Sequence, residues 1–445
     1  MKNVKTTIIH TILVGCATLS LIGCASSLDY QAPLSLYEER NPQEALVSLQ
    51  EHEASYLKED GAIVYGLNAG MVAHSAGFFD ESNTYFGLAE KGIAASYTTS
   101  VSKNVASYLV SENMRSYDSP HYEDIYTNLF KALNYYKMGN TQDAMVEVRQ
   151  MNDKISYYQN ETPLPEDERV HYDAFKYEYT NYPPLTNSGL AQYLSALLSY
   201  EYGDDNYFDV SLKKIDNALK TEGAFYDQDA YQTIEKLHSL DADSTVLSFL
   251  SFSGLAPQKV ETSSRGALIR EAYKDKDGYY HRALYNDIVY SIPMVRNSQI
   301  KFVRVNIDGN VSLLEPFENI STIAFSSMVK KSKAEYTRSF IRILTREIGK
   351  AVVNEQAESN EEKDFASFFS SALNLFTAIS ERADVRCSLF FPARSWIQCF
   401  SVAPGVHSIR VEYLNSNGFI IDCQSFENYN VVQGKANLIE TVSPL

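Results

Sequence analysis

The sequence has little positive charge and little tryptophan. Its 445 residues include 39 Lys and Arg against 56 Asp and Glu, for a net charge of −17, and no basic patch offsets this charge. A surface that binds phosphate needs clustered Lys and Arg, so we expect no nucleic acid among the partners. One Trp stands against 32 Tyr and 22 Phe. Because tyrosine buries its ring and keeps a polar tip, this composition is typical of helix–helix seams and binding surfaces.

The patterns of common catalytic and metal sites are absent as well. The eight histidines are scattered, and none stands at metal-ligand spacing from another His or Cys. There is no H-E-x-x-H, no G-x-S-x-G and no phosphate-binding glycine loop. The stretch SPHYED at 119–124 joins a His to two carboxylates, but a helix start explains it, with Ser119 as N-cap and Pro120 in the first turn. We predict a protein that is not an enzyme and needs no metal and no cofactor.

The first 23 residues are typical of an export signal. Lys2 and Lys5 precede an apolar run of about sixteen residues, shorter than the ~20 that a membrane span needs. The sequences LVGC, ending at Cys16, and LIGC, ending at Cys24, resemble the lipobox of bacterial lipoproteins, whose cysteine carries a diacylglyceryl group. We predict a signal peptide at 1–23, a lipidated Cys24 and a polar tether at 24–33. Cys16 is the alternative, because an apolar region ending at Gly15 fits the usual signal length slightly better.

The residues after Cys24 bear on the location of the protein. In bacteria with two membranes, lipoprotein sorting resembles a rule in which Asp after the lipidated cysteine retains the protein at the inner membrane. Ala25 and Ser26 follow here. We therefore expect a lipid anchor in the outer membrane and a body in the periplasm, and the sequence leaves a surface-facing body open.

Three further cysteines, Cys387, Cys399 and Cys423, lie close together near the C-terminus. In an oxidising compartment, one disulfide with one thiol left over is one prediction, and all three pairings are open. The alternative is that all three cysteines are reduced and buried in strands.

Residues 34–250 show the three- and four-residue apolar spacing of helices. Two stretches share offsets of three, four, five, four and three: Gly70, Ala73, Gly77, Ser82, Phe86, Ala89, and Ala132, Tyr135, Gly139, Ala144, Val148, Met151. A glycine ends the first helix with a left-handed turn, and a small residue lets the second helix approach. The pattern resembles the tetratricopeptide helical hairpin. A non-repeating bundle is the alternative, and either stack of helices offers a groove for a peptide or a protein.

After residue 251 the pattern changes to that of strands. Asp308-Gly309 and Asn417-Gly418, which are typical hairpin turns, each divide a β-enriched stretch. Two helical stretches, 334–354 and 364–383, lie between them. The sequence thus predicts an α+β multidomain protein. A tetratricopeptide-like helical-hairpin region at 34–250 precedes, at 251–445, an antiparallel-sheet domain with two helices on one face.

This second domain holds two candidate binding groups. Arg338, Arg342 and Arg346 stand four apart on a predicted helix and form one stripe, which fits either an anion or partner site or a solvated face paired with carboxylates. Asp384 and Arg386 stand two apart where a helix gives way to a strand, so they share a face. They fit either a structural ion pair or the rim of a binding site.

The segment around Asp384 also resembles a known family. The matching residues are Ala383, Asp384, Arg386, Pro392, Pro404, Gly405, His407 and Ile409. They follow the pattern of an uncharacterised family of bacterial lipoproteins with a tetratricopeptide-like first half and a strand-rich second half. Ser388 and Phe391 stand where that pattern has Trp and Leu, and the helical stretch 119–150 is similar too. The resemblance implies the architecture and the envelope location, and it implies no catalytic residue.

These expectations together indicate an outer-membrane lipoprotein that acts as a scaffold. Its helical region would bind another envelope protein or peptide, and the second domain would add a contact or brace the first. One alternative is an accessory or regulatory factor of cell-wall synthesis or surface export. Another is a carbohydrate- or peptidoglycan-binding or hydrolytic protein that uses the strand-rich domain.

Overall fold

The structure is a computed structural model, and it describes residues 30–99, 117–160, 185–226, 231–240, 244–267, 285–331 and 383–445. The helices are α2 Gln31–Glu38, α3 Pro42–Glu51, α4 Glu53–Glu59, α5 Gly61–Ala76, α6 Phe79–Thr99, α7 His121–Lys137, α8 Thr141–Asn160, α9 Gly189–Tyr202, α10 Asp205–Thr221, the short η4 Gly223–Phe225 and α11 Tyr231–His238. The strands are β1 Val246–Leu255, β2 Gln258–Ala267, β3 Tyr285–Met294, β4 Phe302–Ile307, β5 Asn310–Leu313, β6 Glu315–Pro316, β7 Pro392–Ser401, β8 Gly405–Leu414, β9 Ile420–Val431 and β10 Leu438–Ser443. Residues 320–331 are also helical. The chain is thus α+β, as predicted.

The helices form hairpins where the sequence places glycine stops. Gly77 and Gly203 follow α5 and α9 with φ of 81° and 85°, so each occupies the left-handed position that ends a helix. Gly139 has the same conformation between α7 and α8, with φ of 76°. The predicted close approach at the small residue also holds, because the buried Ser82 hydroxyl of α6 donates to the carbonyl of Gly70 in α5 at 2.7 Å.

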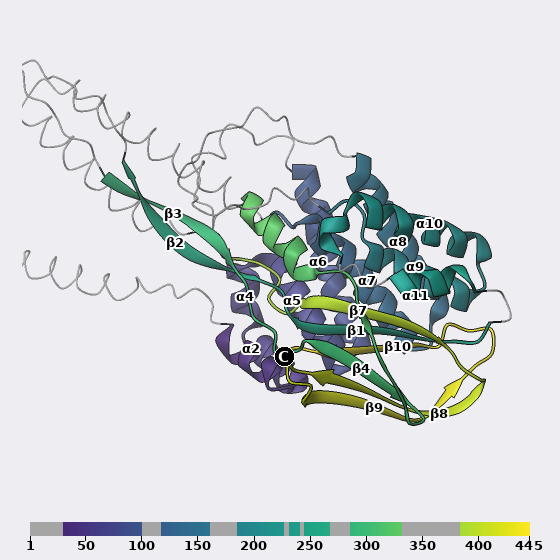
Figure 1. Cartoon of the computed structure of the whole chain (residues 1–445). Coiled ribbons are helices and arrows are strands. Elements are labelled where there is room, and N and C mark those ends of the chain that lie inside the picture. Colours follow the sequence, from purple (N-terminus) through teal and green to yellow (C-terminus); the bar gives the residue numbers. More distant parts are fainter. Residues whose placement is uncertain are drawn as a thin grey trace, which may run out of the picture.

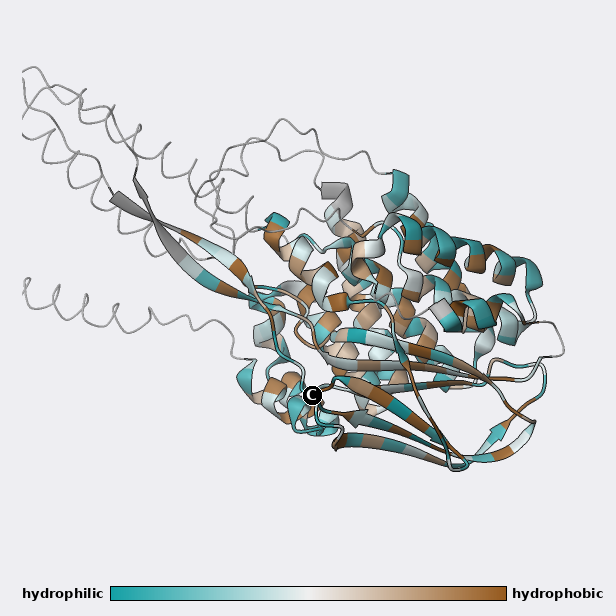
Figure 2. Ribbon diagram, in the orientation of Figure 1, coloured by the Kyte–Doolittle hydropathy of each residue, from teal (hydrophilic) through white to brown (hydrophobic). Residues whose placement is uncertain are grey.

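Two four-stranded sheets stack against the helices to make three layers (Figure 1). The first sheet has the order β10-β1-β7-β6, and the second has the order β5-β4-β8-β9. Strand β1 is buried along its whole length. Leu250 and Phe252 belong to the core shared with the helices, whereas Leu247 and Phe249 belong to the core between the sheets. Figure 2 shows the apolar stretches of the helices gathered toward the sheet, with polar residues on the outer helix surface.

The strand predictions hold at the turns and differ at one pairing. Asp308 and Gly309 have φ of 50° and 91°, the two positive values of a type I′ hairpin turn between β4 and β5. Residues 415–419 connect β8 to β9 as the second predicted hairpin. However, β10 pairs with β1 in parallel, so the first sheet is not purely antiparallel. The chain reaches β10 from β9 in the other sheet, and this crossing lets β10 run beside β1 in the same direction.

The change from helix to strand falls at Val246, five residues before the position expected from the pattern. One hydrophobic core joins the helices to β1, β7 and β10.

The predicted helices at 334–354 and 364–383 lie outside the described residues, apart from residue 383. Strands β2 and β3 pair antiparallel with each other as a separate two-stranded sheet that projects from the body (Figure 1). Within the described ranges, no helix combines the length and apolarity required to cross a membrane.

Candidate binding groove

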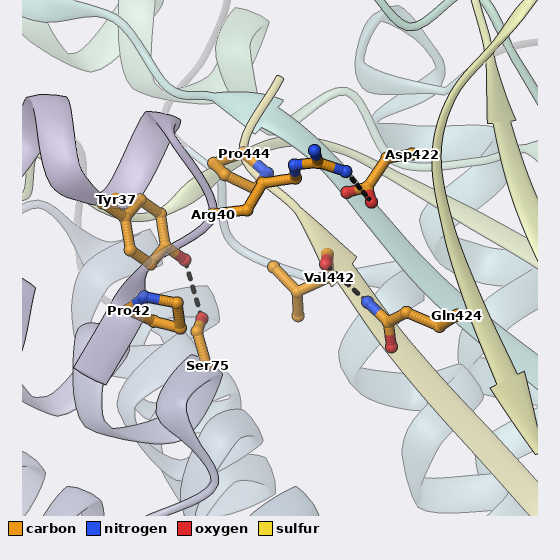
Figure 3. Close-up of a pocket in the computed structure, with 8 residues that line it drawn as sticks. All are labelled: Tyr37, Arg40, Pro42, Ser75, Asp422, Gln424, Val442 and Pro444. Carbon is orange, nitrogen blue, oxygen red and sulfur yellow. Dashed lines mark hydrogen bonds and ion pairs between the residues drawn. The ribbon is translucent and has the colours of Figure 1, made fainter. Parts of the chain in front are cut away.

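A groove runs along the seam between the first helices and the last two strands. Two adjoining cavities of about 160 and 140 Å³ form it, and they share Ser75, Gln424 and Val442. The other residues lining the first cavity are Tyr37, Arg40, Pro42, Asp422 and Pro444 (Figure 3). The others in the second are His74, Gly77, Phe79, Lys137, Glu440 and Thr441. The groove therefore combines segments from opposite ends of the chain, which only the tertiary fold brings together.

The floor of the groove is the free edge of β10. This strand is the edge of its sheet, with β1 on one side only. On the other side, Lys137 Nζ donates to the carbonyl of Glu440 at 2.9 Å, and Gln424 Nε2 donates to the carbonyl of Val442 at 2.8 Å. The N–H of Leu438 donates to the Tyr136 hydroxyl at 2.9 Å. Side chains thus satisfy edge groups that would otherwise accept a further strand.

One end of the groove is built on the carboxylate of Glu440. His74 Nε2 lies 3.4 Å from Glu440 Oε1, and Lys137 Nζ lies 3.1 Å from Oε2. His74 Nδ1 also lies 2.6 Å from Asn134 Oδ1, which orients the ring. Burial alone would raise the pKa of Glu440, but Lys137 and His74 outweigh it and lower the pKa to about 2. Glu440 is therefore held in its charged form beside the Lys137 ammonium and the His74 ring.

The other end of the groove has a second acid–base pair. Arg40 follows α2 with φ of 65°, a left-handed conformation, and its Nη1 lies 3.0 Å from Asp422 Oδ1. Asp422 also accepts from the Ser443 hydroxyl at 2.6 Å. Tyr37 and Ser75 share a hydrogen bond of 2.7 Å in the wall (Figure 3). The Arg40 side chain is 54% exposed, whereas that of Asp422 is 10% exposed, so the cation is the accessible member of this pair.

The size and chemistry of the groove favour an extended polar ligand. Enclosed pockets for small molecules have volumes of roughly 300–1,000 Å³, and each cavity here is smaller. Its lining includes the amide of Gln424, the hydroxyl of Ser75 and the cationic side chains of Arg40 and Lys137. Such a slot suits a short stretch of peptide main chain with one or two side chains in the cavities.

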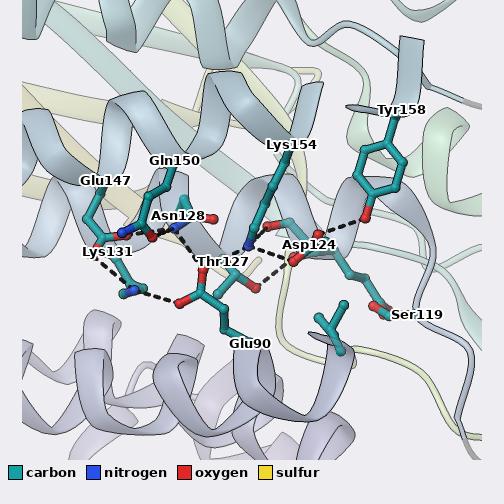
Figure 4. A network of polar contacts seen from close by, with 12 residues as sticks. Glu90, Ser119, Asp124, Thr127, Asn128, Lys131, Glu147, Gln150, Lys154 and Tyr158 are labelled. Atoms are coloured by element: carbon teal, nitrogen blue, oxygen red, sulfur yellow. Dashed lines mark hydrogen bonds and ion pairs between the residues drawn. The ribbon is translucent and has the colours of Figure 1, made fainter. Parts of the chain in front are cut away.

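A second cluster of charges lies between α6, α7 and α8 (Figure 4). Lys154 Nζ lies 2.9 Å from Glu90 and 2.7 Å from Asp124, and Lys131 Nζ lies 2.9 Å from both Glu90 and Glu147. Burial would raise the pKa of Glu90, but the two lysines outweigh it and lower the pKa to about 2. Because each charge has a partner on a neighbouring helix, this cluster fixes the packing of the helices, and it does not line the groove.

The stretch SPHYED has a role that differs from the predicted one. Helix α7 begins at His121 with Pro120 at the N-cap position and no side-chain cap, so Ser119 is not the cap. Instead, the Ser119 hydroxyl donates to Glu123 Oε2 at 2.8 Å. Tyr117 and Ser388 also donate to this buried carboxylate. The carboxylate takes the serine hydroxyl because a buried acceptor without hydrogen-bond donors is costly.

Asp384 and Arg386 lie close to this cluster and outside the groove. Arg386 Nε and Nη2 donate to the two oxygens of Asp384 at 2.7 and 2.8 Å, and the guanidinium lies 5.7 Å from the centre of the Tyr117 ring. Burial opposes the charged form, but Arg386 and Lys259 outweigh it and lower the pKa of Asp384. The two-point geometry and the low exposure, 13% and 11%, match a structural ion pair better than a rim.

The remaining predicted residues have different outcomes. Arg338, Arg342 and Arg346 lie outside the described residues, as do Cys16 and Cys24. The expected disulfide is wrong, because the free cysteines are Cys387, Cys399 and Cys423. Burial raises the pKa of the Cys387 and Cys399 thiols to about 11, whereas Cys423 is exposed on β9. In the part of the chain that the structure describes, no three His, Cys, Asp or Glu side chains are placed to hold a metal ion.

The groove residues and the buried carboxylates were not predicted from the sequence. Glu440 lies near the C-terminus, and Glu318 lies just before the helix at 320–331. No neighbouring residue in the sequence indicates a partner for either carboxylate. His74 and Glu440 are 366 residues apart. The one available signal was a carboxylate within a mostly apolar segment, and Glu440 in the stretch LIETV at 438–442 shows it best.

No protein-family model, no curated protein and no solved structure matches this chain.

Proposed function

We propose that the protein is an outer-membrane lipoprotein that binds an extended segment of another envelope protein in the groove along β10. Cys24 would carry the lipid, and the body would lie in the periplasm. The protein would act as a scaffold without catalysis. The single observation that supports the binding role is the groove itself, whose cavities adjoin over Ser75, Gln424 and Val442.

The helical part supports the same proposal through its shape. The hairpins α5–α6, α7–α8 and α9–α10 end their first helices at glycines with the spacing of tetratricopeptide-like units. We propose that they are degenerate members of that class. Their joint core with β1, β7 and β10 makes one rigid wall for the groove. A rigid wall loses little conformational entropy on binding, which favours recognition of a flexible peptide.

A pair of cysteine variants tests the anchor. Cys24→Ser removes the thiol that would be acylated, and we expect the protein to stall as a precursor or to appear in the soluble periplasmic fraction. Cys16→Ser is the matched control, and we expect it to stay with the outer membrane. Fractionation and intact-mass measurement of the mature chain give the readout. Unchanged membrane attachment of Cys24→Ser would rule out this anchor.

Site-specific photocrosslinking in intact cells tests the groove. A photoreactive amino acid at Gln424 would face the cavity, while the same group at Ser425, the next residue of β9, gives an exposed control. We expect Gln424 to yield one discrete product, and mass spectrometry should map the crosslink to a short extended segment of one envelope protein. The same products at both positions, or none at Gln424, would contradict binding in the groove.

A further inference from the structure

The second sheet ends in a cluster of exposed apolar side chains. Phe302 of β4, Phe419 in the β8–β9 turn and Ile420 of β9 are 46%, 67% and 43% exposed. Phe302 pairs with Leu414 of β8, and Leu414 pairs with Ile420 just past a β-bulge, so Phe302 and Ile420 lie on either side of the buried Leu414 at this end of the sheet. Their neighbours Val303 and Val305 point into the core between the sheets. We refer to Phe302, Phe419 and Ile420 as the apolar sheet end.

The apolar sheet end lies on the same side of the body as the start of the described chain. Asp422, two residues after Ile420, bonds to Arg40 directly after α2. Helix α2 has 8 residues and is therefore about 12 Å long. Figure 1 shows α2, the C-terminus and this end of the sheet close together.

The tether limits how far this side can be from a membrane. Cys24 precedes Tyr30 by six residues, and six residues reach about 20 Å at most. A lipid on Cys24 would therefore hold α2, and with it the apolar sheet end, near the bilayer surface. The charges at this end permit contact with neutral lipid, because Asp422 is paired with Arg40 and Lys301 stands beside Phe302.

We infer that the apolar sheet end rests on the lipid surface to which Cys24 attaches the chain. This inference rests on the proposed lipid anchor. Three partly exposed side chains would bind a bilayer weakly on their own, but the tether raises their effective concentration at the surface. Phe and aliphatic side chains on a surface segment can enter the boundary between headgroups and acyl chains, where their apolar area is removed from water. The contact would fix the orientation of the body relative to the membrane.

Tryptophan quenching by brominated lipid tests the contact in the full-length lipidated protein. The reporter variant is Phe419→Trp, and the matched control is Val406→Trp. Val406 is 64% exposed near the other end of β8, and eight residues of strand separate it from Leu414 by about 26 Å. Trp396 is 2% exposed and common to both variants, so the wild-type signal can be subtracted. The protein is reconstituted into phosphatidylcholine vesicles with acyl chains brominated near the headgroup.

We expect quenching at Phe419→Trp to exceed quenching at Val406→Trp at least twofold. Equal quenching, or stronger quenching at Val406→Trp, would overturn the inference while leaving the anchor intact. Flotation of the wild-type protein with the vesicles separates the two questions. If the wild-type protein isolated from cells carries no acyl groups and does not float with the vesicles, both the proposed anchor and this inference are wrong. The Trp396 emission of both variants should match the wild type, because both replaced side chains are exposed.

Discussion

The carboxylate of Glu318 provides the sharpest test of how this fold is held together. Its side chain is fully buried between the helices and the first sheet. The Ser188 hydroxyl and the Leu190 N–H donate to it at 2.8 and 3.2 Å, and the Tyr226 hydroxyl donates at 2.9 Å. The Tyr126 hydroxyl also donates to it. One side chain thus joins α7, the N-terminus of α9, the segment after η4 and the strand-rich part.

Replacing Glu318 by Ala should therefore be costly. The change leaves four buried donors without their acceptor, and each unsatisfied group costs about 1–3 kcal/mol. These costs do not add fully, because water can enter the space and the desolvation of the carboxylate is relieved. Since this relief offsets part of the loss, we expect Glu318→Ala to lower the free energy of unfolding by about 3–5 kcal/mol in total. Glu318→Gln keeps the shape and one acceptor oxygen, and the hydroxyls can turn to accept, so we expect a loss within about 1 kcal/mol.

The pH dependence of the same site has a definite sign. Burial raises the pKa of Glu318 above its ordinary value of 4.5, although the hydroxyls of Tyr126, Ser188 and Tyr226 oppose the shift. A raised folded-state pKa means that the folded state binds the proton more tightly than the unfolded state. The contribution of Glu318 to stability is thus greatest below pH 4.5 and falls as the pH rises through the raised pKa. The wild type should lose stability relative to Glu318→Gln over this rise.

Urea unfolding followed by Trp396 fluorescence gives the readout. Trp396 is buried on β7 and pairs with Pro316, two residues before Glu318, so its emission reports on this part of the core. Glu427→Ala is the control, because Glu427 accepts one surface hydrogen bond of 3.0 Å from Ser408 and should change the unfolding free energy by less than about 0.5 kcal/mol. Equal losses for Glu318→Ala and Glu427→Ala would refute the reasoning.

Three other predictions use the same structure. Gly66→Ala should destabilise the protein by about 1–3 kcal/mol, because the new Cβ would lie 2.6 and 2.8 Å from backbone atoms of α6. Gly87→Ala meets nothing within 4 Å and should stabilise the helix by about 0.5–1 kcal/mol. Urea midpoints of the two variants that shift in the same direction would contradict this. Because the pKa of Glu440 is lowered to about 2, this carboxylate should add about 3 kcal/mol to the free energy of unfolding above pH 4.5. That stabilisation is lost as the pH falls toward 2. Unfolding of Glu440→Gln, measured over the same pH range, should lack this dependence. Among the cysteines in 383–445, Cys423 should react with a maleimide in the folded protein, whereas the two buried thiols should react only after unfolding. Peptide mass spectrometry that finds a second rapidly labelled cysteine would show that the burial is wrong.

Local features of the fold could be predicted because neighbouring residues cause them. Gly77 and Gly203 end helices since glycine adopts positive φ without a steric penalty, and that property does not depend on distant residues. The turn at Asp308 and Gly309 follows from the same physics. The Asp384–Arg386 pair could also be predicted, because the two residues stand close in sequence, although they lie before β7 and not in a strand as expected.

Contacts between distant segments could not be predicted in this way. The sequence offered Ser119 as a helix cap, but the structure shows its hydroxyl bound to the buried carboxylate of Glu123, which also accepts from Ser388 in a segment 265 residues away. Likewise, the three C-terminal cysteines are close in sequence, yet all three are free. The Cys399 sulfur lies instead against the hydroxyls of Tyr193 in α9 and Ser248 in β1.

By itself, the sequence determined the helical hairpins, their glycine ends, the strand turns and the α+β class, since backbone conformation and apolar spacing act over a few residues. The tertiary structure alone decided the parallel pairing of β10 with β1, the groove along β10 and the partners of the buried carboxylates. The physical reason is that a buried charge or a strand edge must find its partner wherever the chain brings one. For His74 and Glu440, that partner is 366 residues away.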